Sequence, residues 1–388
     1  MKRLDLFMPP LSHYSVLHHF TKKLYEAFQR THVQCRLLEA KTRDPAPFLK
    51  TLLDDPPDCT LSFNGLLPDE KGNFFCDMVQ IPHVTYLVDS PNHYTALTRS
   101  PRTVIACVDR TSVGFFHGLG FSKTLFTPHA VESDLSVSPD TKRDYDVVML
   151  ASNMDYEAQH ASWRKKYPKL LCRVMEEAAD KALSDITTPY YQAFVDALDR
   201  QVNKSADFDP EQIDFLVILD EIERYLLGKD RTNLLQNITE AKVDVFGSSE
   251  GTRGWKKYLD KKRNIVIHDP IPFEQALDIM KHTKILLNSV PSIHEGAHER
   301  IFSGIACGAL VLSNENPYLR KQFIDGESLA FYLPGHYENA NRRVNEYLAD
   351  QAKREHVVHK GQQVVAKSHT WDHRAAQLIQ ELPPLLTK

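Results

Sequence analysis

The chain has 388 residues, of which 42% are hydrophobic and 25% charged, and its formal net charge is −4. This length exceeds one ordinary hydrophobic core and suits two domains of a globular protein. The small negative charge offers no electrostatic basis for binding nucleic acid or an anionic membrane, so neither is expected as a partner. No apolar run reaches the roughly 18 residues that a membrane-spanning helix needs, so no transmembrane segment is predicted.

The six cysteines are dispersed along the chain and form no C-x-x-C pair. Buried thiols in a reducing cytoplasm are therefore expected, and the predicted location is cytoplasmic. The first ten residues begin with two basic side chains, as a signal peptide would, but their apolar run ends early, at Pro9. They are predicted to form the first strand of the fold.

Strands and helices alternate in the first part of the chain. Strands are predicted at residues 3–8, 33–38, 59–63, 83–88 and 103–108, and an amphipathic helix at 12–29. The strands show no clear alternation of apolar and polar residues, which indicates a parallel sheet covered on both faces. A polar segment at 133–142 contains Pro139, so the first domain is assigned to residues 1–138.

The second domain is assigned to residues 139–388. Its first strand, at 145–151, precedes a long region, 156–238, that is rich in helix formers and charge and is predicted to be a helical insertion. The segment 215–219 is ambiguous between helix and strand. Strands are predicted again at 243–246 and 265–267, followed by a helix at 272–281, and residues 338–388 are predicted as terminal helices. The expected fold class is α/β.

The stretch 284–316 carries the main functional signal. A buried strand, a loop, an apolar helix over 301–307 and a second strand form a β-α-β unit. A helix N-terminus and an arginine fork both suit phosphate, and a histidine can donate to a diphosphate oxygen. A nucleotide or sugar-nucleotide site is therefore predicted. The polar residues of the loop, the helix start and the second strand end are His294, Glu295, His298, Glu299, Arg300, Ser313 and Asn314.

The same loop contains H-E-x-x-H, from His294 to His298, which is the zinc-binding pattern of many metalloproteases. That pattern needs a stable helix, yet Pro291 precedes it and Gly296 lies within it, and no third ligand can be assigned. A zinc hydrolase and a purely structural loop are the weaker alternatives, and no metal site is predicted.

Polar residues also end other predicted strands, at the edge where ligands bind in open α/β sheets. Asp89 is a candidate base for an acceptor hydroxyl, and capping of the following turn is the alternative. His13 is a second candidate base, although Ser12 beside it suits a helix cap. Gly247 begins a Gly-Ser-Ser run that resembles a phosphate loop without the spacing of a known motif.

Several short motifs of the second domain occur together and in order. They are Asn288-Ser289-Val290-Pro291, Gly296-Ala297-His298-Glu299-Arg300, Ala306-Cys307-Gly308-Ala309, Leu312-Ser313-Asn314, Phe323-Ile324-Asp325-Gly326, Gly361 and His369-Thr370-Trp371 with Arg374. This set resembles the C-terminal domain of CgeB-like (spore-maturation-type) glycosyltransferases of the GT-B superfamily. Ile81-Pro82, Asp89-Ser90-Pro91 and residues 109–129 are similar to the N-terminal domain often joined to it. The likeness covers about residues 60–150 and 240–385.

The resemblance implies two Rossmann-like domains facing across a cleft, with the sugar-nucleotide donor on the C-terminal one and the acceptor on the N-terminal one. Enzymes of this type generally need no metal. His298 and Arg300 would contact the donor phosphates, and Gly247 and Asn288 would line the donor pocket. Many relatives carry a ribose-binding glutamate four residues before the cysteine of A-C-G, where this chain has Ser303; Glu299, one turn earlier, is the replacement considered.

The expected function is therefore that of a metal-independent glycosyltransferase, of the hexosyltransferase type, that moves a sugar from a nucleotide-diphosphate sugar to a glycan, protein or small molecule. Asp89, or else His13, would activate the acceptor, and His298 would stabilise the leaving diphosphate. No cofactor is expected. A catalytically silent nucleotide-sugar-binding protein is the alternative, because Ser303 departs from the pattern. The expected donor site comprises Gly247, Asn288, His298, Glu299, Arg300, Ser303, Ser313 and Asn314.

Overall fold

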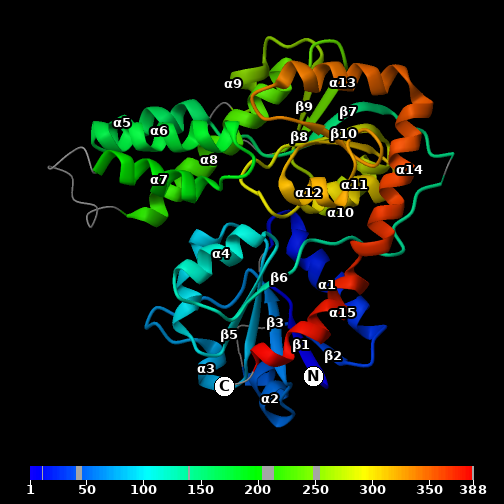
Figure 1. The fold of residues 1–388 in the computed structure, drawn as a ribbon. Helices are drawn as coiled ribbons and strands as arrows, with labels where there is room; N and C mark the ends of the chain where they lie inside the picture. Colours follow the sequence, from blue (N-terminus) through cyan, green and yellow to red (C-terminus); the bar gives the residue numbers. More distant parts are fainter. Residues whose placement is uncertain (11, 41–45, 139, 203–213, 248–253, 387–388) are drawn as a thin grey trace. The chain divides into compact units, whose positions relative to one another are not determined.

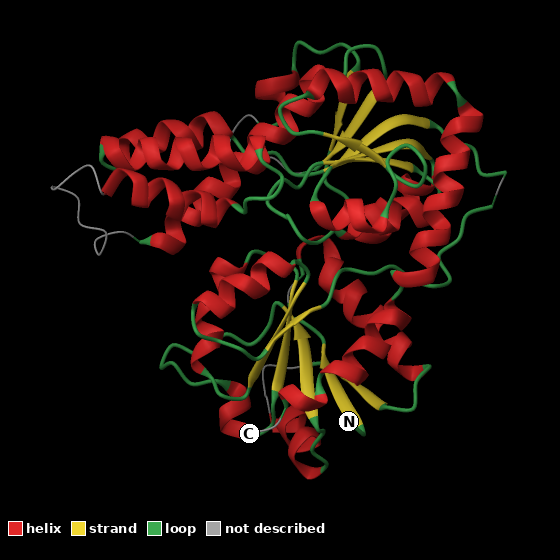
Figure 2. Cartoon of the chain, viewed as in Figure 1, coloured by secondary structure: helices red, strands yellow, loops and turns green. Residues whose placement is uncertain are grey.

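The computed structural model of the protein describes residues 1–10, 12–40, 46–138, 140–202, 214–247 and 254–386 (Figure 1). The chain divides into two compact units, one formed by Met1–Leu135 with Val365–Lys388 and the other by Ser136–Val364. Each unit contains one six-stranded sheet with helices packed around it (Figure 2). The boundary lies close to the expected one at residue 138.

The sheet of the first unit has the strand order β2-β1-β3-β4-β5-β6, and all its pairs are parallel. Its strands β3, β4 and β5 are buried along their whole length, which explains why the sequence does not alternate there. The five predicted strands are confirmed, and the structure adds a sixth after them. They are β1 (Arg3–Phe7), β2 (Gln34–Leu38), β3 (Cys59–Phe63), β4 (His83–Leu87), β5 (Thr103–Cys107) and β6 (Thr124–Phe126).

The helices of the first unit include one from the end of the chain. α15 (Trp371–Glu381) lies beside α1 (Val16–Gln29), where the ring centroid of Trp371 is 5.4 Å from that of Phe20 and 5.9 Å from that of Phe63 (Figure 1). The assignment of residues 338–388 to the second domain therefore holds only up to residue 364, because Trp371 is buried in the first unit. The other elements are α2 (Ala46–Asp54), α3 (Phe75–Val79), α4 (Arg110–Gly118), η1 (His13–Ser15), η2 (Pro91–Arg99) and η4 (Pro383–Leu385).

The second sheet has the order β12-β11-β10-β7-β8-β9 and is also parallel throughout. The chain adds strands outward from β7 on one side, then returns to β10 and adds strands on the other. The carboxyl ends of β7 and β10 therefore flank a topological switch point, which is where open α/β sheets bind ligands. The strands are β7 (Tyr145–Leu150), β8 (Val243–Phe246), β9 (Ile265–His268), β10 (Thr283–Asn288), β11 (Leu310–Asn314) and β12 (Ala330–Tyr332).

The expected helical insertion is present, and in Figure 1 its helices project from the second sheet. The ambiguous segment 215–219 is helical. The end of the last inserted helix differs from expectation, because Leu234, Leu235 and Ile238 join the core formed by the strands. The helices are α5 (Tyr156–Lys166), α6 (Lys169–Ser184), α7 (Tyr190–Val202) and α8 (Phe215–Asn237), and the others of this unit are α9 (Lys256–Leu259), α10 (Phe273–Lys281), α11 (Glu299–Ala306), α12 (Pro317–Gln322), α13 (Tyr337–Ala349) and α14 (Gln351–Ser368).

A glycine sets the approach of α8 to the end of β7. A Cβ atom on Gly228 would lie 2.3 Å from the carbonyl oxygen of Met154, which is far inside van der Waals contact. Only a residue without a side chain lets the helix come this close to the loop after β7. The middle of α8 is thereby brought to the carboxyl edge of the sheet.

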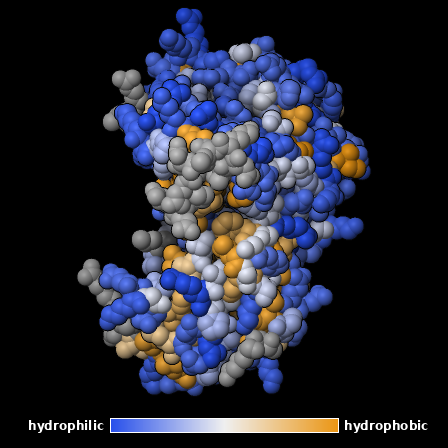
Figure 3. Space-filling view, turned by 60° about the vertical axis from the view of Figure 1, so that its left-hand side comes forward, coloured by the Kyte–Doolittle hydropathy of each residue, from blue (hydrophilic) through white to orange (hydrophobic). Residues whose placement is uncertain are grey.

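The cysteines, the surface and the helix lengths can be compared with what the composition predicts. All six cysteines are buried thiols, as expected. The face of the molecule in Figure 3 is largely hydrophilic, with hydrophobic side chains in smaller groups. Across the ranges described above, no helix has the length and apolar character needed to cross a bilayer.

A buried histidine links the stability of the first unit to pH. His83 is 1% exposed, its Nδ1 lies 2.7 Å from Thr60 Oγ1 and its Nε2 lies 2.9 Å from Ser62 Oγ. Burial lowers the pKa of His83 to about 3. The histidine of the unfolded chain has an ordinary pKa near 6.5. Below that pH the unfolded state therefore binds a proton that the native state does not bind. We therefore expect the free energy of unfolding to fall by up to about 4 kcal/mol between pH 6.5 and 3.

The variant His83→Gln tests this expectation, because it keeps a polar side chain for both hydroxyls and does not titrate. Urea unfolding at several pH values should show a shallower loss of stability below pH 6.5 than in the native protein. His32→Gln, at an exposed position of the same unit, is the control and should leave the pH dependence unchanged. An equally steep loss in His83→Gln would contradict the assignment.

Candidate functional site

Two asparagines, Asn314 at the end of β11 and Asn316 just after it, hold the loop that joins β10 to α11. Asn314 Oδ1 accepts from the backbone N–H of Val290 at 2.9 Å, and its Nδ2 donates to the carbonyl of Val290 at 3.3 Å. Asn316 Nδ2 donates to the carbonyls of Ile293 and Gly296, both at 3.0 Å. Asn314 thus contacts the backbone of this loop, which makes it a support of the site in this structure.

The H-E-x-x-H segment does not lie on a helix. α11 begins at Glu299, with His298 as its N-cap, so residues 294–298 belong to the loop. The helical register that would bring two histidines to one zinc ion is therefore not formed here. The helix thus begins two residues before the predicted span of 301–307.

His298, Glu299 and Arg300 contact one another at the start of α11. Arg300 Nη2 lies 3.0 Å from His298 Nε2, and His298 Nδ1 is in close contact with a carboxylate oxygen of Glu299. Because a guanidinium can only donate, Nε2 accepts, which places the imidazole proton on Nδ1. Nδ1 is also 3.4 Å from the Arg300 backbone N, too far for a strong bond. Burial, and then the charge of Arg300, lower the pKa of His298, so a neutral imidazole orients Arg300.

A second arginine, Arg231 of α8, reaches the same place. It is 6% exposed; its Nε donates to the carbonyl of Ser289 at 3.3 Å and its Nη1 to that of Ser152 at 3.1 Å, just after β10 and β7. Burial, and then the nearby charge of Arg300, lower the pKa of Arg231 to about 10. Both guanidinium groups stay protonated at neutral pH, with Glu299 as the nearby carboxylate, 3.6 Å from Arg300 Nε.

Several buried polar atoms at this edge have no hydrogen-bond partner among the described residues. Within the described part of the chain, no hydrogen bond reaches Arg300 Nη1, Asn288 Oδ1 or either amide atom of Asn153, which is fully buried after β7. An unsatisfied buried donor or acceptor costs about 1–3 kcal/mol, and more when charged. Two converging arginines with an open donor, at the N-terminus of a helix, suit a multiply charged anion such as a diphosphate.

A buried carboxylate positions these groups. Asp230, 0% exposed, accepts from Ser289 Oγ at 2.6 Å, from the Tyr332 hydroxyl at 2.9 Å and from the Tyr337 hydroxyl at 2.7 Å. Burial raises the pKa of Asp230, and the three hydroxyls oppose that shift. The network ties α8 to the loop after β10, to β12 and to α13, so it holds Arg231 and Ser289 in register.

The other predicted residues of this unit lie at or near the same edge. Asn288 Nδ2 donates to Ser313 Oγ at 3.0 Å, and Ser313 Oγ donates to the carbonyl of Asn314 at 3.0 Å. Ser303 is 2% exposed within α11. The contacts of Ser303 and Glu299 with a ribose stay predictions.

Gly247 follows β8, and steric packing explains why this position is a glycine. A Cβ atom there would lie 1.9 Å from the carbonyl oxygen of Ala151, so only glycine allows the end of β8 to pack against the end of β7. Ser248 and Ser249, the rest of the predicted phosphate loop, lie outside the described residues.

The candidate bases belong to the first unit and are described separately. Asp89 is exposed after β4 and its Oδ2 accepts from Asn64 Nδ2 at 2.7 Å, while Asn64 Oδ1 accepts from the Val88 backbone N–H at 2.9 Å. The ends of β3 and β4 therefore bring Asn64 and Asp89 together. His13 lies in η1, after β1, and its side chain is outside the described part of the structure.

Arg231, Asp230 and Asn153 were missing from the sequence-based site. The sequence does contain a pattern that points to Asp230 and Arg231. Leu227, Leu234 and Ile238 form an apolar stripe at helical spacing, and the Asp230-Arg231 pair interrupts this stripe. Charged residues in such a stripe are buried, and buried charges are paired or functional. The stretch was instead assigned as an insertion without a site.

Comparison with known proteins gives a family match for part of the second unit and structural relatives for the fold. Residues 231–380 match the family described as "Glycosyl transferase-like", and the match begins at Arg231. No curated protein matches the sequence significantly. The CgeB-like assignment stays a prediction.

Three solved structures resemble the whole chain. They are sucrose-phosphate synthase from Thermosynechococcus elongatus (TM-score 0.58, 11% identity, 99% of each chain covered), AviGT4, a glycosyltransferase involved in avilamycin A biosynthesis (TM-score 0.56, 10% identity, 100% of this chain and 98% of that one), and Anabaena HepE in complex with UDP-glucose (TM-score 0.54, 11% identity, 98% and 99%). The two parallel six-stranded sheets with their helices have the GT-B glycosyltransferase fold, and the predicted fold class is confirmed.

Proposed function

We propose that this protein is a glycosyltransferase that uses a nucleotide-diphosphate sugar as donor. The observation that carries the proposal is the proximity of Arg231 to Arg300 at the start of α11, with no partner for Arg300 Nη1 among the described residues. The family match over residues 231–380 and the GT-B fold support the same reaction class. HepE, a structural relative, was crystallised with UDP-glucose, which makes this nucleotide sugar the first donor to test.

In the proposed reaction the diphosphate leaves as its bond to the anomeric carbon breaks. Negative charge then grows on the departing oxygen, and the two arginines and the N–H groups of α11 are placed to stabilise it. His298 keeps the Arg300 guanidinium in position through the 3.0 Å contact. Because these protein cations take the role that a divalent ion has in other transferases, we propose a metal-independent transfer of a hexose.

The acceptor hydroxyl attacks the anomeric carbon and loses its proton. We assign the proton to the carboxylate of Asp89, which is exposed and oriented by Asn64. His13 is the second choice for this role. Acceptors within the proposal are a glycan, a protein or a small molecule, and the proposed location is the cytoplasm.

The first experiment is calorimetric titration with UDP-glucose and with UDP in the presence of EDTA, followed by measurement of glucose release. We expect UDP to bind nearly as tightly as UDP-glucose, because the arginines recognise the diphosphate, and we expect slow release of glucose. Asp89→Asn should reduce sugar transfer and leave donor binding unchanged. Binding without any release would favour the alternative, a silent nucleotide-sugar-binding protein, and failure of uridine, guanosine, thymidine and cytidine diphosphate sugars to bind would overturn both.

A further inference from the structure

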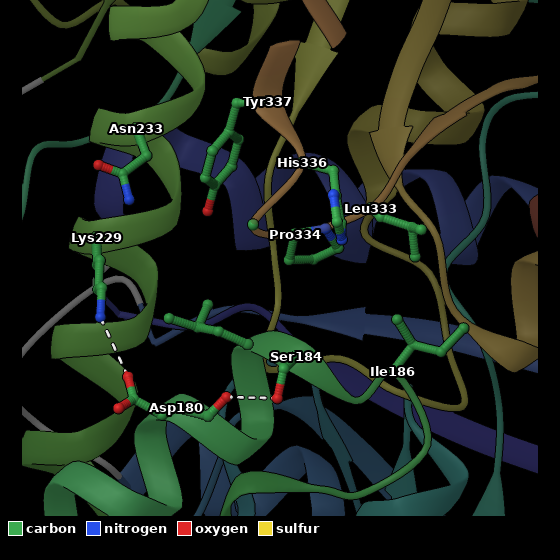
Figure 4. A pocket seen from close by; sticks show the side chains of 11 residues that line it. Asp180, Ser184, Ile186, Lys229, Asn233, Leu333, Pro334, His336 and Tyr337 are labelled. Atoms are coloured by element: carbon green, nitrogen blue, oxygen red, sulfur yellow. Dashed lines mark hydrogen bonds and ion pairs between the residues drawn. The ribbon is translucent and has the colours of Figure 1, made fainter. Parts of the chain in front are cut away.

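A cavity lies in the second unit, between the helical insertion and the turn after β12 (Figure 4). Its volume is about 370 Å³, and we call it the insertion pocket. Three segments form it: the end of α6, the middle of α8 and the turn that leads from β12 into α13. Its lining residues include Asp180, Lys229, Asn233, Leu333 and Tyr337.

The polar side of the insertion pocket offers donors and acceptors without excess charge. Lys229 Nζ lies 3.3 Å from Asp180 Oδ1, so the two charges balance. Asn233 lies one turn after Lys229 on α8, and its side-chain amide hydrogen-bonds the Tyr337 hydroxyl (Figure 4). A balanced set of this kind favours neutral hydroxyl groups, which both donate and accept, over an anion.

The opposite side of the insertion pocket is mainly apolar, and His336 is the titratable side chain that also lines it (Figure 4). Leu183, Ile186, Leu333 and Pro334 line it, and Leu333 is 39% exposed. A sugar ring carries hydroxyls around its edge and C–H groups on its faces, so it matches one polar and one apolar wall. Pockets that bind small molecules usually start at about 300 Å³. The insertion pocket is therefore suited to a single sugar ring, well below the size of a nucleotide sugar.

The polar wall is already held in place. The Tyr337 hydroxyl donates to the buried Asp230 carboxylate at 2.7 Å, and Lys229 Nζ lies 5.1 Å from the centroid of the Tyr225 ring. Side chains fixed before binding lose little conformational entropy when a ligand arrives. This order makes the pocket a formed site in the structure.

We propose that the insertion pocket binds a neutral sugar unit, either as a free monosaccharide or as the end of a glycan chain. This site is separate from the arginine site, and its existence does not depend on the proposed transfer reaction. It also gives the helical insertion a role, because α6 supplies one of the three walls.

The test is calorimetric titration with methyl α-glucoside, maltotriose and glucose 6-phosphate in the presence of saturating UDP, which keeps the arginine site filled. We expect the neutral sugars to bind more tightly than the phosphate. Tighter binding of maltotriose than of the glucoside would identify a glycan end, and the reverse a free monosaccharide. Absence of binding by both neutral sugars, or preference for glucose 6-phosphate, would overturn the proposal.

Matched variants locate the binding. Leu333→Trp should fill the pocket and weaken sugar binding at least tenfold, whereas Leu216→Trp, at an equally exposed (39%) leucine of α8 outside the pocket, should not. Lys229→Met should weaken sugar binding several-fold, and Lys181→Met, on the exposed face of α6, is its control. Unchanged sugar affinity in Leu333→Trp would rule the pocket out. A separate UDP-glucose titration of Leu333→Trp should match the native protein, so failure of this site and failure of the donor site give different results.

Discussion

Replacing Arg300 by alanine should weaken UDP-glucose binding by about 100-fold, which corresponds to about 2.7 kcal/mol. Arg300 has a buried Nη1 without a partner in the described chain, and its Nη2 is held by His298, so its hydrogen-bonding capacity is oriented and partly free for a phosphate. Its removal leaves no equivalent fork at the N-terminus of α11. Calorimetric titration with UDP-glucose and with UDP should show the same loss, because the contact is with the diphosphate.

The control is Arg342→Ala, which removes an exposed arginine of α13 and should bind the donor normally. A second readout is the titration of His298 by NMR. Because the charge of Arg300 lowers the pKa of His298, that pKa should rise in Arg300→Ala. If the variant had the same affinity for UDP-glucose and the same His298 pKa as the native protein, Arg300 would not belong to the donor site.

Replacing Asp230 by alanine should lower the free energy of unfolding by about 4 kcal/mol. Three buried hydroxyls, those of Ser289, Tyr332 and Tyr337, would lose the same acceptor, and Arg231 would lose its neighbouring negative charge. Asp230→Asn keeps one acceptor oxygen and should cost less. Donor affinity should fall as well, because the network positions Arg231. Urea denaturation and UDP-glucose titration measure the two effects.

The pH dependence of the free energy of unfolding shows whether Asp230 acts through its ionisable carboxyl group or only through packing. Burial raises the pKa of Asp230 above its usual value near 3.8, so the native state holds this proton more tightly than the unfolded chain. Its contribution to the free energy of unfolding therefore falls as pH rises above 3.8, and Asp230→Asn should lack this component. Asp199→Ala, at an exposed site on α7, is the control. A loss below about 0.5 kcal/mol in Asp230→Ala would show that the network has little energetic weight.

Local patterns predicted most of the framework. The strands that become β1 to β5, β7, β8 and β9 all occur at or within a residue or two of their expected places, because continuous apolar runs followed by turn residues leave few alternatives. The helix start at Glu299 was also predictable from local chemistry, with His298 before it and an apolar run after it. The short edge strand β12 was not predicted, because its three residues provide too little pattern.

The amino-acid order alone was enough to identify the α/β class, the β-α-β unit at 284–316 and the polar residues at its strand ends, because these depend on apolar runs, helix caps and turn residues along the chain. Packing decided the rest. Arg231 and Arg300 are 69 positions apart and meet because Gly228 lets α8 approach the loop after β7, and Asp230 then fixes the helix to β12 and α13. Likewise α15 joins the first unit because Trp371 is buried against Phe20 and Phe63. Such contacts depend on how the side chains of distant segments fit together, and local sequence patterns do not predict this fit.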